Sequence, residues 1–258
     1  MRVTVCELPD LPEALEEAWR GLVSHVRAAA SELVLLPELP FARWFAIRRD
    51  FELAEWRRAV EGHEAWARRL EELAPAVVLG TRPVESSEGR FNEAFVREQG
   101  GGPRGVHLKR YLPDEPGFWE ASWYARGSAP PPIVRCGPAL ASFQICTELW
   151  FLHVSRDLGK RGLHLLAAPR CTPVSSADKW LAAGRVAAVV SGAFCLSSNW
   201  CGPSATSPSV VFAGRGWITG PEGDVLAETS PSAPFVTRDL DLGEADRAKR
   251  TYPRYVVD

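Results

Sequence analysis

A stretch that is apolar at every position constrains this chain most. Residues 33–36 read Leu-Val-Leu-Leu, and residues 76–80 have the same character. A strand with one face in water alternates apolar and polar residues, so an unbroken apolar run predicts a strand covered on both faces. The chain must therefore supply further layers on both sides of these strands.

Helical periodicity supplies the covering layers. Asp10 and Glu13 form a capping-box pattern, and Pro12 is suited to the first turn of the helix that follows. A second, long helix is expected from Asp50 to Pro75. A helix rich in small residues is expected from Ser175 or Ser176 through residue 190. Apolar residues mark the inward face of the first helix at Leu11, Leu15, Trp19, Leu22 and Val26.

The remaining strand patterns include hairpins as well as strand–helix alternation. Residues 216–219 and 225–228 flank a Gly-Pro-Glu-Gly-Asp turn, which predicts a hairpin. Hairpins mixed with alternation exclude a simple parallel doubly wound sheet. We expect an α/β (α+β) fold with a mixed sheet, or two, covered by helices. Further strands are expected at 3–8, 91–98, 106–111, 133–136, 141–146, 163–168, 194–198 and 235–240, and short helices at 151–158 and 243–250.

Composition narrows the classes of function. The 258 residues carry a formal net charge of -2, whereas a nucleic-acid surface would favour a basic excess. No apolar segment is long enough to predict a signal peptide or a membrane span, so we expect a cytoplasmic protein with its six cysteines reduced. No linker or repeat divides the chain, and one domain over residues 1–258 is expected.

Three polar side chains stand at the ends of predicted strands. Glu38 follows the buried run, where partial desolvation would raise its pKa and make it a usable base. Lys109 lies within the predicted strand 106–111, close to its end. Cys146 stands where a strand meets a helix, near backbone N–H groups that favour a thiolate. Each also has a bland interpretation: a paired carboxylate, a solvated lysine and an inert buried cysteine.

Taken together and in order, the sequences around these residues resemble the nitrilase superfamily, or carbon–nitrogen hydrolases. The three motifs read LLPELPF at 35–41, LKRYLP at 108–113 and QICTELWF at 144–151. Supporting matches are FNEA at 91–94 and PEG at 221–223, and the stretch containing Glu120 looks most like the amidase and carbamoylase branches. The resemblance implies a four-layer α-β-β-α sandwich of two mixed sheets flanked by helices.

The resemblance also implies a mechanism without metal or cofactor. Glu38 would take the proton of Cys146, whose thiolate would attack an amide, carbamoyl or nitrile carbon to form a thioester. Lys109 and the backbone N–H of Thr147 would stabilise the oxyanion. Glu120 would orient Lys109 or the substrate nitrogen. A surface carboxylate is the alternative interpretation of Glu120.

Departures from the family pattern bear on the substrate. Thr147 and Glu148 follow the cysteine where members commonly have Tyr or Trp and then Asp. Arg170 falls where related enzymes contact substrate, and it could bind a substrate carboxylate or pair with Glu148 instead. Residues expected at an aromatic pocket rim, with core or interface packing as the alternative, are Phe41, Trp44, Trp119, Trp123 and Trp150.

Several functions stay open at this point. The leading expectation is hydrolysis of a small-molecule amide or N-carbamoyl compound. A nitrilase, an acyl transferase and a non-catalytic binding or scaffold protein are the alternatives. The resemblance further implies a homodimer or a higher even oligomer, with helices near residues 151–158 and Gly184 as candidate interface elements.

Overall fold

The computed structural model describes residues 1–207 and 209–257. Its helices are α1 (Pro12–Ala28), α2 (Leu53–Ala67), α3 (Glu120–Trp123), α4 (Leu152–Lys160), α5 (Ala177–Ser191) and α6 (Leu242–Ala248). Its strands are β1 (Arg2–Pro9), β2 (Leu33–Leu35), β3 (Val77–Ser86), β4 (Gly89–Arg97), β5 (Arg104–Leu108), β6 (Val134–Cys136), β7 (Ala139–Phe143), β8 (Leu165–Pro169), β9 (Phe194–Pro203), β10 (Val211–Ala213), β11 (Trp217–Thr219), β12 (Val225–Glu228) and β13 (Phe235–Asp239).

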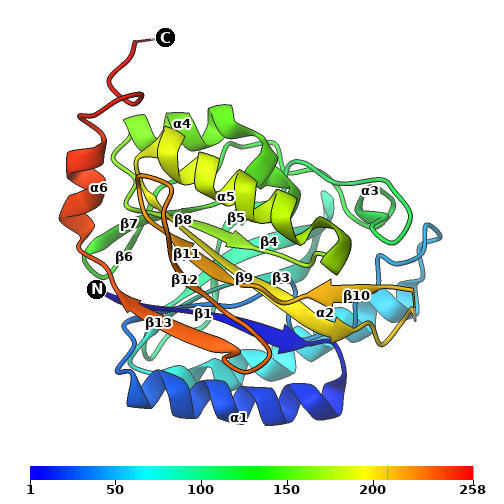
Figure 1. The fold of residues 1–258 in the computed structure, drawn as a ribbon. Coiled ribbons are helices and arrows are strands. Elements are labelled where there is room, and N and C mark those ends of the chain that lie inside the picture. Colours follow the sequence, from blue (N-terminus) through cyan, green and yellow to red (C-terminus); the bar gives the residue numbers. More distant parts are fainter. Residues whose placement is uncertain (208, 258) are drawn as a thin grey trace.

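These strands form one continuous mixed sheet, so the prediction of two separate sheets is wrong. The order along its main path is β5-β4-β3-β2-β1-β9-β8-β7-β6. Strand β1 joins the two halves because β2 and β9 pair with different parts of it. Its residues 3–5 pair with β2, and its residues 7–9 pair with β9. Figure 1 shows the folded sheet between α1 and α2 on one side and α4 and α5 on the other.

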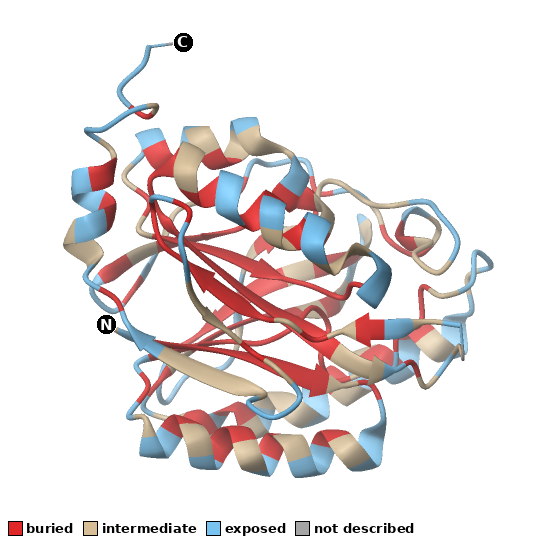
Figure 2. Ribbon diagram, viewed as in Figure 1, coloured by how far each residue is buried: buried red, intermediate tan, exposed pale blue. Residues whose placement is uncertain are grey.

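Burial follows this layering. The strands are mostly buried, and the helices turn their buried faces toward them (Figure 2). All three residues of β2 and all five of β8 are buried, as expected for strands covered on both faces. The small residues of α5 pack within the chain: a side chain at Gly184 would meet the Trp217 ring at 2.7 Å. That part of α5 is therefore not free to meet a second copy.

Several local predictions need correction. Helix α1 begins at Pro12 as expected, but it has no side-chain cap. Asp10 instead accepts hydrogen bonds from the backbone of Trp44 and Ala205, so the capping box does not form. The long second helix starts at residue 53 and tightens into a 3-10 helix, Arg68–Leu73. Strand β10 was not predicted. The 216–228 hairpin is confirmed as β11 and β12.

The described residues include no helix with both the length and the apolarity needed to cross a lipid bilayer.

Candidate active site

The ends of three strands bring the predicted polar residues to one region. Glu38 lies three residues after β2, Lys109 follows β5 directly, and Cys146 lies three residues after β7. The predicted strand through residue 146 ends at Phe143, and Cys146 opens a 3-10 helix, Cys146–Trp150. Glu120 is the first residue of the short helix α3. Strand ends thus position Glu38, Lys109 and Cys146, and a short helix supplies Glu120.

Lys109 lies between two carboxylates. Its Nζ donates to Glu38 Oε1 at 2.7 Å and to the two oxygens of Glu120 at 2.8 and 2.7 Å. All three side chains are at most 1% exposed. Burying charges is costly unless they are paired and hydrogen-bonded. Fixed ion pairs in such a place are more typical of a functional site than of a stabilising device.

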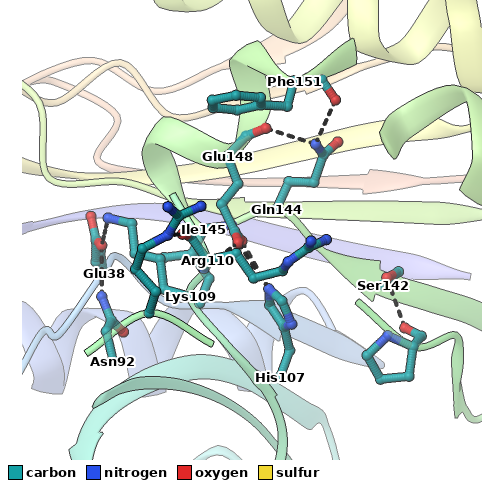
Figure 3. A network of polar contacts seen from close by, with 12 residues as sticks. Glu38, Asn92, His107, Lys109, Arg110, Ser142, Gln144, Ile145, Glu148 and Phe151 are labelled. Carbon is teal, nitrogen blue, oxygen red and sulfur yellow. Dashed lines mark hydrogen bonds and ion pairs between the residues drawn. The ribbon is translucent and has the colours of Figure 1, made fainter. Parts of the chain in front are cut away.

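The two oxygens of Glu38 are unequal. Oε1 accepts from Lys109 and, at 2.8 Å, from Asn92 Nδ2, as Figure 3 shows. Oε2 is buried and has no hydrogen-bond partner among the described residues. The main chain is held as well, because the Glu38 N–H donates to the Arg170 carbonyl and the Trp200 indole donates to the Glu38 carbonyl. Glu38 therefore presents one free acceptor on a rigid support.

Cys146 has a backbone conformation that non-glycine residues rarely adopt. Its φ is +47°, and its side chain is almost buried, at 4% exposure for the residue. Burial raises the pKa of its thiol, and the Glu38 carboxylate raises it further. Lys109 and the backbone N–H of Cys171 act in the opposite direction. The resting thiol is therefore neutral and needs a base before it can act as a nucleophile.

The neighbouring charges also shift the titration of Lys109 and Glu120. Burial disfavours the Lys109 cation, but Glu120 and Glu38 outweigh burial and raise the pKa of Lys109 above its usual range. Burial raises the pKa of Glu120 to about 8, although Lys109 opposes this shift. Lys109 thus stays positive at neutral pH, whereas Glu120 titrates close to neutral pH.

A cavity of about 670 Å³ reaches Glu120 and Cys146, whereas Glu38 and Lys109 are not among its lining residues. Its lining includes Cys146, Thr147, Glu120 and Trp150, all of which were candidates from the sequence. The lining also includes the exposed side chains of Glu115 and Lys179, which carry opposite charges. Small polar molecules of either charge can therefore find a partner here.

Other sequence candidates do not line this cavity. Arg170 is fully buried, and its guanidinium donates to Ser197 Oγ, Thr172 Oγ1 and the Arg215 carbonyl. Among the described residues it does not pair with Glu148, and each of its three guanidinium nitrogens already donates to a protein oxygen. The reason is local: Arg170 directly follows β8 and points into the protein rather than into the cavity.

The aromatic rim is also smaller than expected. Phe41 stacks on Trp66 in the core cluster under α1. Trp119 lies under the Arg49 guanidinium, and its neighbour Phe118 lines the cavity in its place. Trp44 and Trp123 are core residues at 0% and 1% exposure. Only Trp150 of the five predicted aromatics reaches the cavity.

Sequence reasoning missed two polar residues close to the site. Asn92 was noted only as part of a motif, yet it holds Glu38. Glu148 is buried and binds His107 and two backbone N–H groups, which the pattern of residues 144–151 did not indicate. The described part of the chain contains no cluster of three or more His, Cys, Asp or Glu arranged for a metal ion.

Known structures resemble this fold over nearly the whole chain. A carbon-nitrogen hydrolase from Helicobacter pylori G27 superposes with a TM-score of 0.86 at 19% identity, covering 98% of this chain and 94% of that one. An amidase variant from Nesterenkonia sp. AN1, with acrylamide added at its active-site cysteine, superposes with a TM-score of 0.79 at 20% identity and covers 95% of each chain.

Characterised sequences are similar at low identity. N-carbamoylputrescine amidase from Arabidopsis thaliana is 24% identical over 247 residues, which cover 88% of this chain and 81% of that protein. 2-Oxoglutaramate amidase from Paenarthrobacter nicotinovorans is 23% identical over 248 residues, covering 91% and 80%. The model of the family described as carbon-nitrogen hydrolase matches residues 2–250. The chain therefore belongs to the carbon-nitrogen hydrolase family, within the nitrilase superfamily.

Proposed function

We propose that this protein is an amidase-type hydrolase that cleaves an amide or N-carbamoyl carbon–nitrogen bond through a thioester on Cys146. One domain over residues 1–258 would carry the activity. The carrying observation is the free Oε2 of Glu38, in a buried cluster where Lys109 is held between two carboxylates beside the cavity of Cys146. A neutral thiol, a base with an open acceptor and a fixed cation are the parts that such chemistry needs.

Acylation would begin with proton transfer from Cys146 to Glu38. The sulfur then bonds to the carbonyl carbon, and the carbonyl oxygen becomes an oxyanion. Lys109 and the backbone N–H of Thr147 are the proposed donors to that oxyanion. A preorganised donor of this kind contributes on the order of 3 kcal/mol to transition-state stabilisation.

Glu38 would then give its proton to the departing nitrogen, and the carbon–nitrogen bond breaks to leave the thioester. In the second half, Glu38 takes a proton from water, the hydroxyl attacks the thioester carbon, and the sulfur leaves and recovers its proton. Glu120 would hold Lys109 in place throughout, since it accepts two of the hydrogen bonds that the Lys109 ammonium donates.

The substrate class is inferred from the cavity and from the relatives. Two relatives are named for an N-carbamoyl amine and for an amide, which supports a terminal amide or carbamoyl group as the part that reacts. The cavity adds an aromatic wall at Trp150 and one exposed charge of each sign, Glu115 and Lys179. We propose a small polar substrate. A cationic substrate would pair with Glu115, and an anionic one with Lys179.

A matched panel tests the proposal. Amides, N-carbamoyl compounds and nitriles with the same cationic, anionic or neutral side chain are incubated with the enzyme, and ammonia release is measured. We expect release from amides or carbamoyl compounds and none from Cys146→Ala or Glu38→Gln. Release from nitriles alone would assign a nitrilase. No release from any member, together with a Cys146 that resists iodoacetamide, would contradict the proposal and favour a binding protein.

Two additions complete the test. Product analysis with added amines separates hydrolysis from acyl transfer, because a transferase would form a new amide rather than the free acid. We also propose a homodimer or a closed multiple of dimers, built through the outer layer of α4 and α5, where Val186 is 43% exposed. Light scattering that gives a monomer at micromolar concentration would contradict this assembly.

A further inference from the structure

The side chains that would react come from strands that no backbone ladder joins. Strand β5, which precedes Lys109, stands at one end of the main sheet path. Strand β7, which precedes Cys146, is next to the other end. Hydrogen bonds between neighbouring strands therefore cannot hold Lys109 in register with Cys146. Some other contact must fix the distance between the two loops.

Glu148 makes that contact. Its Oε2 accepts from the backbone N–H of Ile145 at 2.8 Å, immediately before Cys146. Its Oε1 accepts from the backbone N–H of Arg110 at 2.8 Å, immediately after Lys109. Figure 3 shows one carboxylate reaching both loops from the short helix that begins at Cys146. Glu148 thus ties together the two peptide units that flank the reactive residues.

His107 completes the carboxylate's shell. Its Nε2 lies 3.1 Å from Oε1 and 3.0 Å from Oε2 of Glu148. The His107 and Glu148 side chains are 1% and 3% exposed, so neither is solvated. His107 lies in β5, two residues before Lys109. The Glu148–His107 pair therefore orients the strand that delivers Lys109.

The contact also supports the turn of Cys146. A residue at φ +47° persists only where its surroundings hold it there. Glu148 does so from both sides, because its own N–H donates to the Ile145 carbonyl while its carboxylate accepts from the Ile145 N–H. Loss of the carboxylate would leave the Ile145 and Arg110 N–H groups without acceptors inside the protein.

We propose that Glu148 and His107 are positioning residues for the reaction, which clamp the Lys109 strand to the Cys146 turn. This inference rests on the proposed function. The clamp acts on geometry rather than on substrate, so its loss should lower kcat and the reactivity of Cys146 while KM stays nearly constant. A displacement of about 1 Å in such a site is enough for a loss on the order of 100-fold.

The test uses Glu148→Gln, His107→Leu and His107→Gln, with Ser155→Ala as the matched control. Gln at position 107 can still donate from the place of Nε2, whereas Leu cannot. Ser155, on α4, is buried and donates to Gln144, and among the described residues it has no bond to the Lys109 strand. The readouts are the rate of Cys146 alkylation by iodoacetamide, followed by mass spectrometry, and kcat and KM on an amide that the wild type hydrolyses.

We expect Glu148→Gln to slow alkylation at least about tenfold and to lower kcat on the order of 100-fold, with KM within about threefold. His107→Leu should follow in the same direction, and His107→Gln should restore rates to within about threefold of the wild type. Ser155→Ala should keep wild-type rates even where its melting temperature falls.

Two results would overturn the clamp and leave Glu148 a stabilising residue only. One is a Glu148→Gln enzyme with wild-type rates, and the other is a Ser155→Ala enzyme that loses as much activity as Glu148→Gln. Should Glu148→Gln fail to fold, the His107 pair decides: equal rates in His107→Leu and His107→Gln would overturn the proposal. Alkylation needs no substrate. A wild type that hydrolyses no amide would therefore refute the proposed function and still leave the alkylation comparison to judge the clamp.

Discussion

Two buried cations lie near the cavity, and their partners differ in kind. Lys109 is held by two carboxylates at 2.7–2.8 Å. Arg170 is equally buried, yet among the described residues its guanidinium reaches only hydroxyl and carbonyl oxygens and lies 3.9 Å from the centre of the Trp217 ring. Carboxylates raise the pKa of Lys109, whereas burial lowers the pKa of Arg170.

The difference assigns them different tasks. Lys109 has a charge supported by Glu38 and Glu120, and the cavity is lined by Glu120 and Cys146. The guanidinium of Arg170 donates to neutral groups, and its backbone carbonyl accepts from the Glu38 N–H. The charge of Lys109 is held by two carboxylates, one of which lines the cavity, whereas Arg170 has no carboxylate partner among the described residues. We therefore regard Arg170 as a support for the loop.

Removal of Lys109 should have the largest effect. Lys109→Met takes away the proposed oxyanion donor and leaves two buried carboxylates unpaired. We expect kcat/KM to fall about 10²–10³-fold or more, and the free energy of unfolding to drop by about 3–5 kcal/mol. Steady-state kinetics and urea denaturation measure both. A folded Lys109→Met enzyme with wild-type kcat/KM would show that this cation has no part in the reaction.

Glu120, one carboxylate partner of Lys109, should affect how the stability of the protein depends on pH. Glu120 has a pKa of about 8 in the folded protein, against an ordinary value of 4.5. The folded protein therefore keeps a proton that the unfolded chain releases, and its stability falls as pH rises from about 4.5 to 8. Glu120→Gln cannot release that proton and should flatten the slope, as measured by urea denaturation at several pH values. Parallel slopes in variant and wild type would refute the raised pKa.

Arg170→Met should affect stability more than activity. Its loss leaves hydroxyl and carbonyl groups unsatisfied, at an expected cost of about 1–3 kcal/mol in unfolding free energy. The ratio of kcat/KM for a carboxylate-bearing amide to that for its neutral analogue should not change. Lys179→Ala, which removes the exposed cation in the cavity lining, is the matched comparison. A change of ratio in Arg170→Met alone would restore the sequence-based hypothesis that Arg170 binds substrate.

Trp150→Ala should have the smallest effect on the protein and a selective one on binding. The side chain is 46% exposed at the cavity, so we expect the free energy of unfolding to change by less than about 0.5 kcal/mol. KM should rise several-fold while kcat is nearly constant, because a wall contact binds ground state and transition state alike. An unchanged KM across the substrate panel would place Trp150 outside the binding site.

The contrast between these cations also explains how far the sequence could lead. The closeness of Glu38, Lys109 and Glu120 was predictable, since each follows a strand or turn with a recognisable local motif. The direction of the Arg170 side chain was not predictable. Arg170 directly follows β8, and a small change in its backbone angles decides whether the side chain points into the cavity or into the interior. Phe41 and Trp119, for which packing was the alternative interpretation, do not line the cavity either.

The continuity of the sheet and the role of Glu148 were beyond local patterns for a different reason. Strand β1 connects the two halves of the sheet only because β2 and β9, from distant parts of the chain, pair with its two ends. Glu148 contacts His107 and Arg110, which lie 41 and 38 positions earlier in the chain. No periodicity in either segment encodes such a meeting. Buried polar side chains next to a motif are the signal that could have pointed to Glu148.

The central claim is that Cys146 carries the acyl group, and peptide mass spectrometry of the quenched enzyme tests it most directly. Wild-type protein is mixed with an amide that it hydrolyses, stopped with acid during turnover and digested. The account predicts the mass of the acyl group on the peptide that contains Cys146, and no turnover by Cys146→Ala. An unmodified Cys146 peptide throughout turnover, together with hydrolysis by Cys146→Ala, would contradict it.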